Sequence, residues 1–322
     1  MKSETFLPRP NLYGWRVADS GNRILLGDNL ELMARMEAGS FQLIYADPPF
    51  NTGRQQSRKR VRTVADEGGD RTGFGGRRYR TEAVEPEGEG TAAGSEIGEA
   101  ASGSESGTVA TGTGTVASGS SYADSFDDFT AFLAPRLEQI HRLLNETGTL
   151  YLHIDYREAH YVKVLLDSIF GRECFLNEII WAYDYGGKSK SRWPAKHDTI
   201  LVYVKDPEQY FFDSTEVDRE PYMAPGLVTP EKAAKGKLPT DVWWHTIVPT
   251  NGSEKTGYPT QKPEGILSRM VTASSRPGDL CLDPFCGSGT LGAVCQKLDR
   301  RYVLLDSSPE AISVTRDRLG TG

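Results

Sequence analysis

The chain of 322 residues is 38% hydrophobic and 25% charged, which suits a folded protein with a sizeable core, built as one large domain or two ordinary ones. No run approaches the ~20 consecutive apolar residues of a membrane-spanning helix, and the first residues lack the apolar stretch of a signal peptide. We therefore expect a cytoplasmic protein without a membrane partner. The formal net charge of −7 at first argues against a nucleic-acid partner.

The negative charge is concentrated in one segment, however. Residues 81–128 contain seven Glu and three Asp and no Lys or Arg, so the rest of the chain carries a net charge of +3. Residues 54–80, directly before, contain nine Lys and Arg against three acidic residues. The net charge therefore does not exclude a nucleic-acid partner.

Short apolar segments with strand character alternate with amphipathic helical segments along most of the chain. We expect strands at residues 23–27, 42–46, 149–154, 178–183, 199–205, 279–282 and 301–305, and helices at residues 30–37, 126–144, 157–170, 263–274, 290–298 and 309–319. Gly171 suits the end of a helix and Pro309 the first turn of one. The alternation predicts an α/β fold with a seven-stranded, mostly parallel sheet covered on both faces. Because no helix separates strands 178–183 and 199–205, we expect that pair to be antiparallel at one edge of the sheet.

Residues 55–121 interrupt this pattern. Their first part is basic, and residues 88–121 consist mostly of Gly, Ser, Thr, Ala and Glu. Such a composition cannot bury enough apolar surface to offset the entropy of ordering it. We expect a disordered insertion. Its basic half could wrap DNA or be an expendable spacer, and a spacer is favoured for its acidic half.

Asp47-Pro48-Pro49-Phe50 follows strand 42–46 and therefore lies at the carboxyl edge of the sheet, where α/β proteins bind ligands. The prolines stiffen the loop and remove two backbone donors, which leaves carbonyl acceptors beside the Asp47 carboxylate. Binding both N–H groups of a base's amine to Asp47 and the Pro48 carbonyl would favour a pyramidal nitrogen that can attack a methyl sulfonium. Phe50 would stack on a base that has left the duplex. Taken alone, a rigid turn that caps a strand explains the four residues better.

Residues 184–258 are harder to interpret. Lys188, Lys190, Arg192 and Trp193 interleave cations with an aromatic ring, a pattern that suits phosphate contacts and base stacking. An irregular lobe with a small core explains the segment equally well. The four cysteines, Cys174, Cys281, Cys286 and Cys295, lack paired metal-ligand spacing and are expected to be reduced, mostly buried thiols.

Residues 283–290 form a glycine-rich turn between strand 279–282 and helix 290–298. Gly287 and Gly289 would let the backbone approach a ligand, and the helix N-terminus offers free N–H groups. The next strand ends in Asp306, which could accept both hydroxyls of a ribose. A Gly-Ser-Gly turn alone is weak evidence, but the whole series of strand, turn, helix, strand and acid favours a nucleotide-like cofactor. The Gly-Lys-Ser/Thr ending of a phosphate-binding P-loop is absent.

With both loops in view, the chain resembles the S-adenosylmethionine-dependent amino-methyltransferases of DNA, in particular the beta group, where the catalytic motif precedes the cofactor motif. Other stretches that look like motifs of this family are residues 26–29, 148–155, 197–203, 259–263 and 279–319. The resemblance implies a Rossmann-like methyltransferase fold with a circularly permuted motif order. It covers nearly the whole chain except the insertion and part of residues 206–250.

The resemblance also implies roles for matching residues. The catalytic pocket would consist of Asp47, Pro48, Pro49 and Phe50. The cofactor S-adenosylmethionine would be bound by Asp28, Asp47, Thr260, Gln261, Lys262, Asp283, Phe285, Cys286, Gly287, Ser288, Gly289, Thr290 and Asp306. Within this set Asp28 would hold the adenine, Asp306 the ribose and Asp283 the amino group, with residues 260–262 near the carboxylate. Without the resemblance, Asp28 is equally a helix cap and Lys262 a solvated lysine.

The same resemblance divides the chain. Residues 1–54 begin the catalytic domain, residues 55–121 are the insertion, and residues 122–205 continue the domain. Residues 206–258 form an irregular lobe that, with residues 184–205, is the candidate DNA-recognition region. Residues 259–322 complete the cofactor-binding part.

The resulting function is methyl transfer to the exocyclic amine of a flipped-out base in double-stranded DNA. Adenine N6 is favoured over cytosine N4, because cytosine enzymes often have Ser in place of Asp47. The alternatives are an RNA or protein-glutamine methyltransferase and an inactive DNA-binding relative. Any restriction activity would lie in a separate endonuclease, a homodimer is compatible with the family, and no metal is expected.

Overall fold

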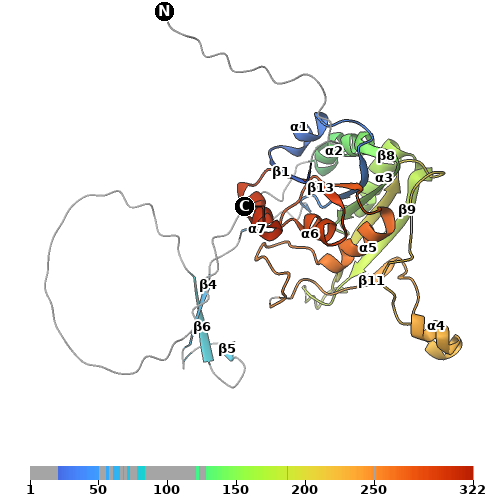
Figure 1. The fold of residues 1–322 in the computed structure, drawn as a ribbon. Helices are drawn as coiled ribbons and strands as arrows, with labels where there is room; N and C mark the ends of the chain where they lie inside the picture. The colour runs from blue at the N-terminus through green and yellow to red at the C-terminus, as the bar shows by residue number, and fades with distance from the viewer. Residues whose placement is uncertain are drawn as a thin grey trace, which may run out of the picture. The chain divides into compact units, whose positions relative to one another are not determined.

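The computed structural model describes residues 21–50, 128–186, 188–249 and 251–321, together with Gly68 and five short strands between residues 56 and 122. The chain divides into two compact units (Figure 1), one of residues 1–54 and 124–322 and one of residues 55–123. We describe each unit by itself.

An eight-stranded sheet forms the centre of the first unit. Its strands are β1 (Arg23–Leu26), β2 (Phe41–Ala46), β8 (Leu144–Ile154), β9 (Phe175–Ala182), β10 (His197–Val204), β11 (Val242–Trp244), β12 (Leu280–Asp283) and β13 (Arg301–Asp306), in the spatial order β1-β13-β12-β2-β8-β10-β9-β11. Every neighbouring pair is parallel except the two pairs that β10 makes with β8 and β9. β2 precedes β12 and β13 in the chain by more than two hundred residues but lies beside β12 in the sheet, which is the permuted order expected.

Two details of the predicted sheet need correction. The sheet has eight strands instead of seven, because residues 242–244 add a short parallel strand outside β9. The antiparallel strand is not at the edge: β10 returns from β9 by a hairpin and fills the place between β8 and β9. The predicted antiparallel pairing of these two segments is confirmed.

Helices cover both faces of the sheet (Figure 1). The helices that cover the sheet are α1 (Asn29–Ala34), α2 (Phe129–Leu143), α3 (Ala159–Phe170), α5 (Glu264–Ser274), α6 (Thr290–Lys297) and α7 (Pro309–Leu319), and a further short helix, α4 (Pro230–Lys235), lies apart from it. The core is correspondingly split: Ile44 of β2 packs in a cluster with residues of α1, α2 and α3, whereas its neighbours Leu43 and Tyr45 pack with α5, α6 and α7. Successive β2 side chains therefore lie on opposite faces of the sheet. The residues after β2 emerge at the carboxyl edge of the sheet, between the two helix layers.

Local signals set the ends of the helices. Asp128 accepts a hydrogen bond from Ala131 N–H and begins α2, and Ser308 with Pro309 begins α7. Gly171 ends α3 with a φ of 91°, a backbone region that glycine adopts without strain. The predicted roles of Gly171 and Pro309 are confirmed.

The lobe at residues 206–241 has little regular structure. It contains a short 3₁₀ turn (Pro225–Leu227) and α4, which lies away from the sheet on a projecting segment (Figure 1). Backbone hydrogen bonds between Glu220 and Lys237 close the base of this segment.

In the second unit, the described strands form two small sheets. β4 (Val61–Ala65), β6 (Arg78–Ala83) and β5 (Arg71–Thr72) make an antiparallel sheet in that order, and β3 (Gln56–Ser57) pairs with β7 (Ser121–Tyr122). None of these five strands was predicted from the composition of the insertion. Residues 84–120, which include most of the acidic half, lie outside the described residues.

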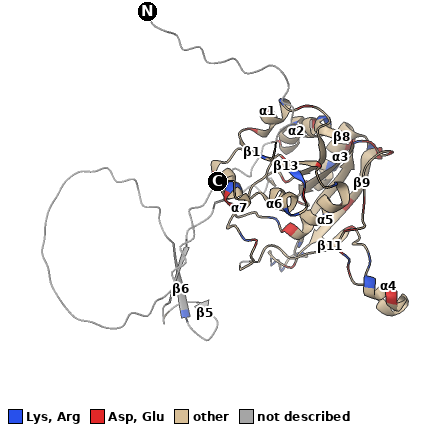
Figure 2. Ribbon diagram, in the orientation of Figure 1, with Lys and Arg blue, Asp and Glu red and all other residues tan. Residues whose placement is uncertain are grey.

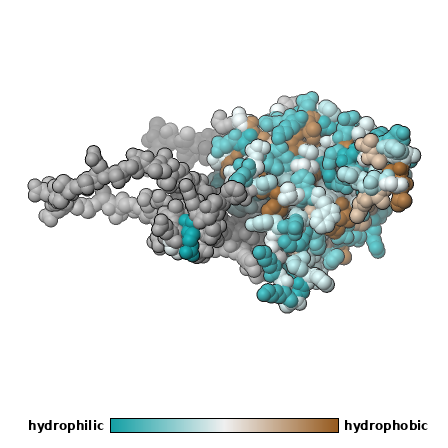
Figure 3. Space-filling model, turned by 90° about the horizontal axis from the view of Figure 1, so that it is seen from below, coloured by the Kyte–Doolittle hydropathy of each residue, from teal (hydrophilic) through white to brown (hydrophobic). Residues whose placement is uncertain are grey.

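The surface of the first unit carries both signs of charge. Both basic and acidic segments are scattered over the ribbon (Figure 2), and hydrophobic residues occur as separate patches among hydrophilic ones on the face shown in Figure 3. In the part of the chain that the structure describes, no helix has the length and apolar character needed to cross a bilayer.

Candidate functional site

A row of acidic residues follows the carboxyl edge of the sheet. Five adjacent parallel strands, β1, β13, β12, β2 and β8, end at or just before Asp28, Asp306, Asp283, Asp47 and Asp155 in that order. The carboxyl edge of such a sheet is where ligands bind. An acid whose negative charge is already paired with a cation of the protein has less need of a ligand, so the partners of each carboxylate indicate where a ligand would fit.

The two outermost acids are paired with arginines. Asp28 caps α1 by accepting hydrogen bonds from the N–H groups of Leu30 and Glu31, and its Oδ2 lies 3.0 Å from Arg136. Asp155 pairs with Arg157 at 2.7 Å. The helix-cap interpretation of Asp28 is thus confirmed, and its adenine contact stays a prediction.

Asp47 is paired with Lys262, which lies 215 positions away in the chain. The Lys262 Nζ atom is 2.5 Å from Asp47 Oδ2, and the two side chains are only 11% and 15% exposed. The same ammonium lies 4.7 Å from the centroid of the Phe50 ring, which is a cation–π distance. Residues of the catalytic and cofactor motifs therefore meet in one cluster.

The two middle acids lack a cation. Asp283 is 2% exposed and accepts a hydrogen bond from the N–H of Phe285. Asp306 accepts hydrogen bonds from the N–H groups of Gly287 and Ser308, at 2.9 and 2.8 Å. Neither forms an ion pair with a described residue. Burial raises the pKa of both carboxyls, and the nearby charges of Asp47 and Asp306 raise that of Asp283 further. This part of the edge is suited to a ligand that brings positive charge or hydrogen-bond donors.

The glycine-rich turn between β12 and α6 is shaped by packing within the protein. Gly287 and Gly289 have φ angles of 50° and 71°, so L-residues would be strained there. A Cβ atom at Gly289 would lie 2.7 Å from Thr315 Cγ2, and one at Gly287 would lie 3.2 Å from Tyr258. The glycines therefore serve the turn and its contacts with α7 and the 258 region, in addition to any ligand.

Other side chains of the turn are also turned inward. Cys286, Ser288 and Thr290 are each no more than 5% exposed. Arg318 of α7 donates hydrogen bonds to the Ser288 carbonyl and to Thr290 Oγ1, at 3.2 and 3.0 Å. Any contact of these residues with a ligand would thus be made by the backbone, whose N–H groups begin α6.

The three residues 260–262 differ in their surroundings. Thr260 is exposed. Gln261 is used structurally, because its side chain accepts hydrogen bonds from Thr256 and donates one to the Glu254 carbonyl at 2.6 Å. Lys262 has its backbone carbonyl bound by Thr290 Oγ1 at 3.1 Å and its side chain on Asp47.

A buried hydrogen-bonded chain lies beside the loop of residues 47–50. Tyr45 OH lies 2.9 Å from His153 Nδ1, His153 Nε2 lies 3.1 Å from Asp198 Oδ2, and Tyr183 donates to Asp198 at 3.0 Å. The His153 side chain is fully buried, and its ring lies 5.6 Å from that of Phe50. Sequence analysis assigned no role to these four residues, although His153 and Asp198 fall in stretches noted as family-like.

The predicted DNA-binding residues lie in the loop between β9 and β10. Tyr183 N–H bonds to the Lys196 carbonyl at 2.9 Å and closes the hairpin. Lys188, Lys190 and Arg192 are exposed, and Trp193 is 95% exposed. Because β9 runs parallel to β8, this loop leaves the sheet at the same edge as Asp47.

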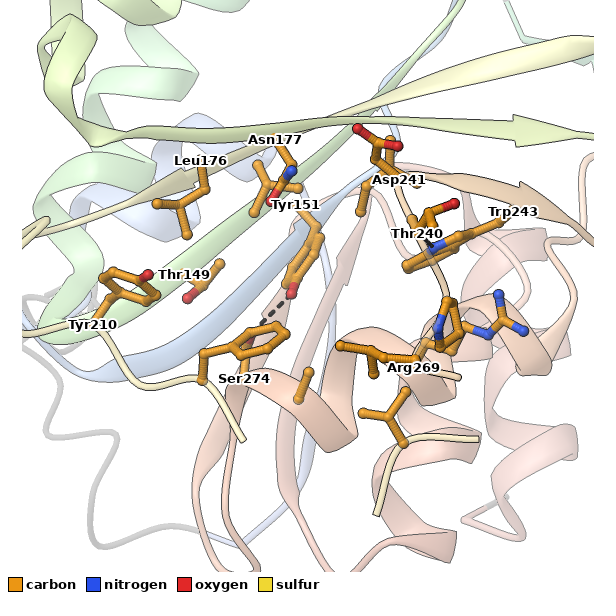
Figure 4. A pocket seen from close by; sticks show the side chains of 17 residues that line it. Thr149, Tyr151, Leu176, Asn177, Tyr210, Thr240, Asp241, Trp243, Arg269 and Ser274 are labelled. Carbon is orange, nitrogen blue, oxygen red and sulfur yellow. Dashed lines mark hydrogen bonds between the residues drawn. The ribbon is translucent and has the colours of Figure 1, made fainter. Parts of the chain in front are cut away.

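A separate cavity lies on the α5 face, under the other half of the sheet. It has a volume of about 550 Å³, and Figure 4 shows the rings of Tyr151, Tyr210 and Trp243 around it. Arg269, at its side, donates to Asp218 and lies 3.0 Å from Glu220. Thr149 Oγ1 is buried there without a hydrogen-bond partner among the described residues. None of the predicted site residues lines this cavity.

Among the residues that the structure describes, no three His, Cys, Asp or Glu side chains are grouped as a metal site. All four cysteines are buried, as predicted.

Comparison with known proteins gives related sequences. A family model described as DNA methylase matches residues 41–317. The chain is 33% identical over 198 residues to Type II methyltransferase M.HpaI of Haemophilus parainfluenzae, covering 61% of this chain and 60% of that relative. It is 30% identical over 201 residues to DNA adenine methyltransferase YhdJ of Escherichia coli K12, covering 60% of this chain and 67% of that relative. The alignment thus spans 60% of the first relative's own length.

Solved structures show a similar fold. PvuII DNA methyltransferase (cytosine-N4-specific) superimposes with a TM-score of 0.57 at 14% identity, over 93% of this chain and 86% of that one. The M1.HpyAVI–SAM complex gives a TM-score of 0.52 at 17% identity, over 92% and 98% of the two chains. The prediction of a methyltransferase-like α/β fold is therefore confirmed.

Proposed function

Since the chain belongs to the DNA methylase family, we propose that it transfers a methyl group from S-adenosylmethionine to the exocyclic amine of a base in duplex DNA. The observation that carries this proposal is the distribution of charge at the carboxyl edge. Asp283, which is buried, and Asp306, which is partly buried, form no ion pair with a described residue and end the strands next to the loop that holds Asp47 and Phe50. A cationic cofactor bound at these two acids, next to a loop that binds the amine, accounts for this arrangement.

The residues at the edge fit S-adenosylmethionine, which supplies a methyl group activated on a sulfonium. Asp283 can accept its ammonium group, which offsets the cost of a buried carboxylate that has no counter-ion. Asp306 can accept the ribose hydroxyls. Asp28 would lie by the adenine, while Thr260, Lys262 and the N-terminus of α6 would lie near the carboxylate.

Asp47 would prepare the amine for attack. Its carboxylate and the Pro48 carbonyl accept the two N–H groups, so the lone pair is less delocalised into the ring. Phe50 stacks on the base, and the turn of Pro48 and Pro49 fixes both groups. As the N–C bond forms and the S–C bond breaks, the nitrogen loses one proton, which Asp47 can pass to water.

Adenine N6 is the favoured target. The reason remains the Asp at position 47, and the relative YhdJ is named a DNA adenine methyltransferase. The PvuII enzyme, whose title specifies cytosine N4, shares only 14% identity. Cytosine N4 is the second candidate.

The exposed loop between β9 and β10 would contact the DNA. Lys188, Lys190 and Arg192 can bind phosphates, and Trp193 can stack on bases. The relatives named Type II methyltransferases suggest a partner restriction endonuclease, and a homodimer is a further proposal. A protein-glutamine substrate is disfavoured by Asp47 and by this basic, aromatic loop. The intact Asp47 and the turn at Gly287 and Gly289 disfavour decayed catalysis.

A transfer assay tests the proposal. The purified protein is incubated with radiolabelled S-adenosylmethionine and duplex DNA of varied sequence, with RNA and protein as controls, and cofactor binding is measured in parallel. We expect label in DNA only. Absence of label from every DNA, under conditions where the cofactor binds, would refute the proposal. Modification-sensitive sequencing of DNA from expressing cells then identifies the base, the atom and the sequence together.

A further inference from the structure

The side chain of Lys262 occupies the position that the target amine needs. Its ammonium lies 2.5 Å from Asp47 Oδ2 and 4.7 Å from the centroid of Phe50. These are the carboxylate and the ring to which the proposed function assigns the amine and the base. Lys262 and the target base therefore compete for one place.

The backbone of Lys262 is fixed next to the N-terminus of α6, where its side chain can reach a bound cofactor as well as Asp47. Its carbonyl accepts a hydrogen bond from Thr290, the first residue of α6, and the next residues begin α5, where Arg318 binds Glu264 at 2.8 Å. The N-terminus of α6 is where the cofactor's carboxylate is proposed to bind. A flexible lysine side chain rooted beside that point can contact either the cofactor or Asp47.

The charges around Lys262 allow its ammonium to move from Asp47 to the cofactor without leaving an unpaired carboxylate behind. Besides Asp47, the carboxylates of Asp283 and Asp198 interact electrostatically with its ammonium. Simply withdrawing the lysine would leave Asp47 buried and unpaired, which is strongly unfavourable. A cofactor that brings an ammonium and a sulfonium to these acids, and a carboxylate to Lys262, removes that cost.

We propose that Lys262 is a two-position side chain that pairs with Asp47 until it binds the carboxylate of the cofactor, and so releases Asp47 to the target amine. This inference rests on the proposed function. It makes Lys262 a positioning residue, and it makes access of the base to Asp47 dependent on prior cofactor binding.

A double-mutant cycle tests the first position. The stabilities of wild type, D47N, K262M and D47N/K262M are measured by urea unfolding, without ligand and with saturating S-adenosylmethionine. Without ligand, K262M should destabilise the wild type but have much less effect in the D47N background. With ligand, this coupling should disappear. If K262M alone folds too poorly for the cycle, the binding comparison between D47N and D47N/K262M still tests the proposal, because neither of these proteins leaves Asp47 charged and unpaired.

Calorimetric binding tests the second position. S-adenosylmethionine is compared with decarboxylated S-adenosylmethionine, which differs only in the carboxylate, in the D47N and D47N/K262M proteins. Loss of the lysine should weaken binding of the first compound roughly tenfold or more and leave the second unchanged. K297M is the matched control, because Lys297 pairs with Glu264 on the same side of the sheet and is not in contact with Asp47.

The possible outcomes distinguish failure of the proposed function from failure of the proposal for Lys262. If wild type binds neither compound, the proposed function and this inference fail together. If both compounds bind but lose affinity equally, or if the coupling between Asp47 and Lys262 persists with saturating cofactor, only the inference is overturned.

Discussion

The carboxyl edge of the sheet and the cavity on its α5 face are both lined by buried polar groups, but the groups are balanced differently. At the edge, carboxylates dominate, and Asp283 and Asp306 form no ion pair with a residue that the structure describes. In the cavity, the one charged cluster is internally paired, since Arg269 binds Asp218 and Glu220. The buried atoms there without a hydrogen-bond partner among the described residues are the Thr149 hydroxyl and Arg269 Nη1, and the latter lies 3.0 Å from the Glu220 carboxylate.

From this difference we expect a ligand at the carboxyl edge of the sheet and none in the cavity. A buried charge without a partner is costly, so a protein that keeps one is expected to obtain compensation from something it binds. Burying a hydroxyl without a hydrogen-bond partner costs much less free energy than burying an unpaired charge. The cavity itself is covered by irregular chain from residues 210–240, a part of the described structure in which no helix packs against the sheet. The predictions below test that contrast, beginning with the largest effect.

Removing the carboxylate of Asp47 should nearly abolish function. We expect D47A to lower methyl transfer by ~10²–10⁴-fold or more, because the amine loses its acceptor, while cofactor affinity is mostly retained. Radiolabel transfer and calorimetry measure the two quantities. Turnover like that of the wild type would contradict the role of Asp47.

The rim of the same edge should contribute to DNA affinity through charge and stacking separately. The triple variant K188A/K190A/R192A should weaken DNA binding and reduce the slope of log K against log salt by about 2.7, if three phosphate contacts contribute ~0.9 each. W193A should weaken binding without changing the slope. Fluorescence anisotropy over a range of salt concentrations measures both. An unchanged slope in the triple variant would remove this loop from the interface.

Neutralising Asp283 should stabilise the ligand-free protein and weaken cofactor binding. Burial raises its pKa above the unfolded value of 3.8, so between those two pKa values the folded state binds more protons than the unfolded chain. Stability therefore falls as pH rises through that window. D283N should be more stable than wild type at pH 8, should lose this advantage in acid, and should bind the cofactor roughly tenfold or more weakly.

Urea unfolding at several pH values and calorimetry measure these effects. D155N is the matched control, since Asp155 is paired with Arg157 and its neutralisation should not stabilise. If D283N is destabilised at pH 8, Asp283 does not carry the uncompensated charge described.

In the cavity, the expected effect is small. T149V replaces an unpaired hydroxyl with a methyl group of similar size and should change stability by less than ~1 kcal/mol, toward stabilisation, with methyl transfer unchanged. T147V, on the same strand, should destabilise by about 1 kcal/mol, because Thr147 donates to Gln42 at 2.8 Å. Thermal unfolding compares them. A large activity loss in T149V would give the cavity a functional role.

Several parts of this arrangement could be predicted from the sequence. Seven strands and six helices follow from hydrophobic periodicity and from caps such as Gly171, and Asp47, Asp283 and Asp306 lie at strand ends because each acid follows an apolar run. The pairing of Lys262 with Asp47 could not be predicted, because 215 residues separate them and only the permuted sheet order brings them together. β11 was missed because three residues, two of them tryptophan, give no alternation to detect. The inward orientation of Cys286, Ser288 and Thr290 depends on Arg318, whose contact is visible only in three dimensions.

The hairpin between β9 and β10 has a consequence for how this enzyme family could diversify. Its loop is closed by the hydrogen bond from Tyr183 N–H to the Lys196 carbonyl, and the buried chain of Asp198, His153 and Tyr45 links β10 to β2 through β8. The loop can thus be exchanged as a module for one of different length or sequence while the chemistry below it is left intact. Grafting a hairpin from a relative at these two positions would then transfer sequence preference from one methyltransferase to another.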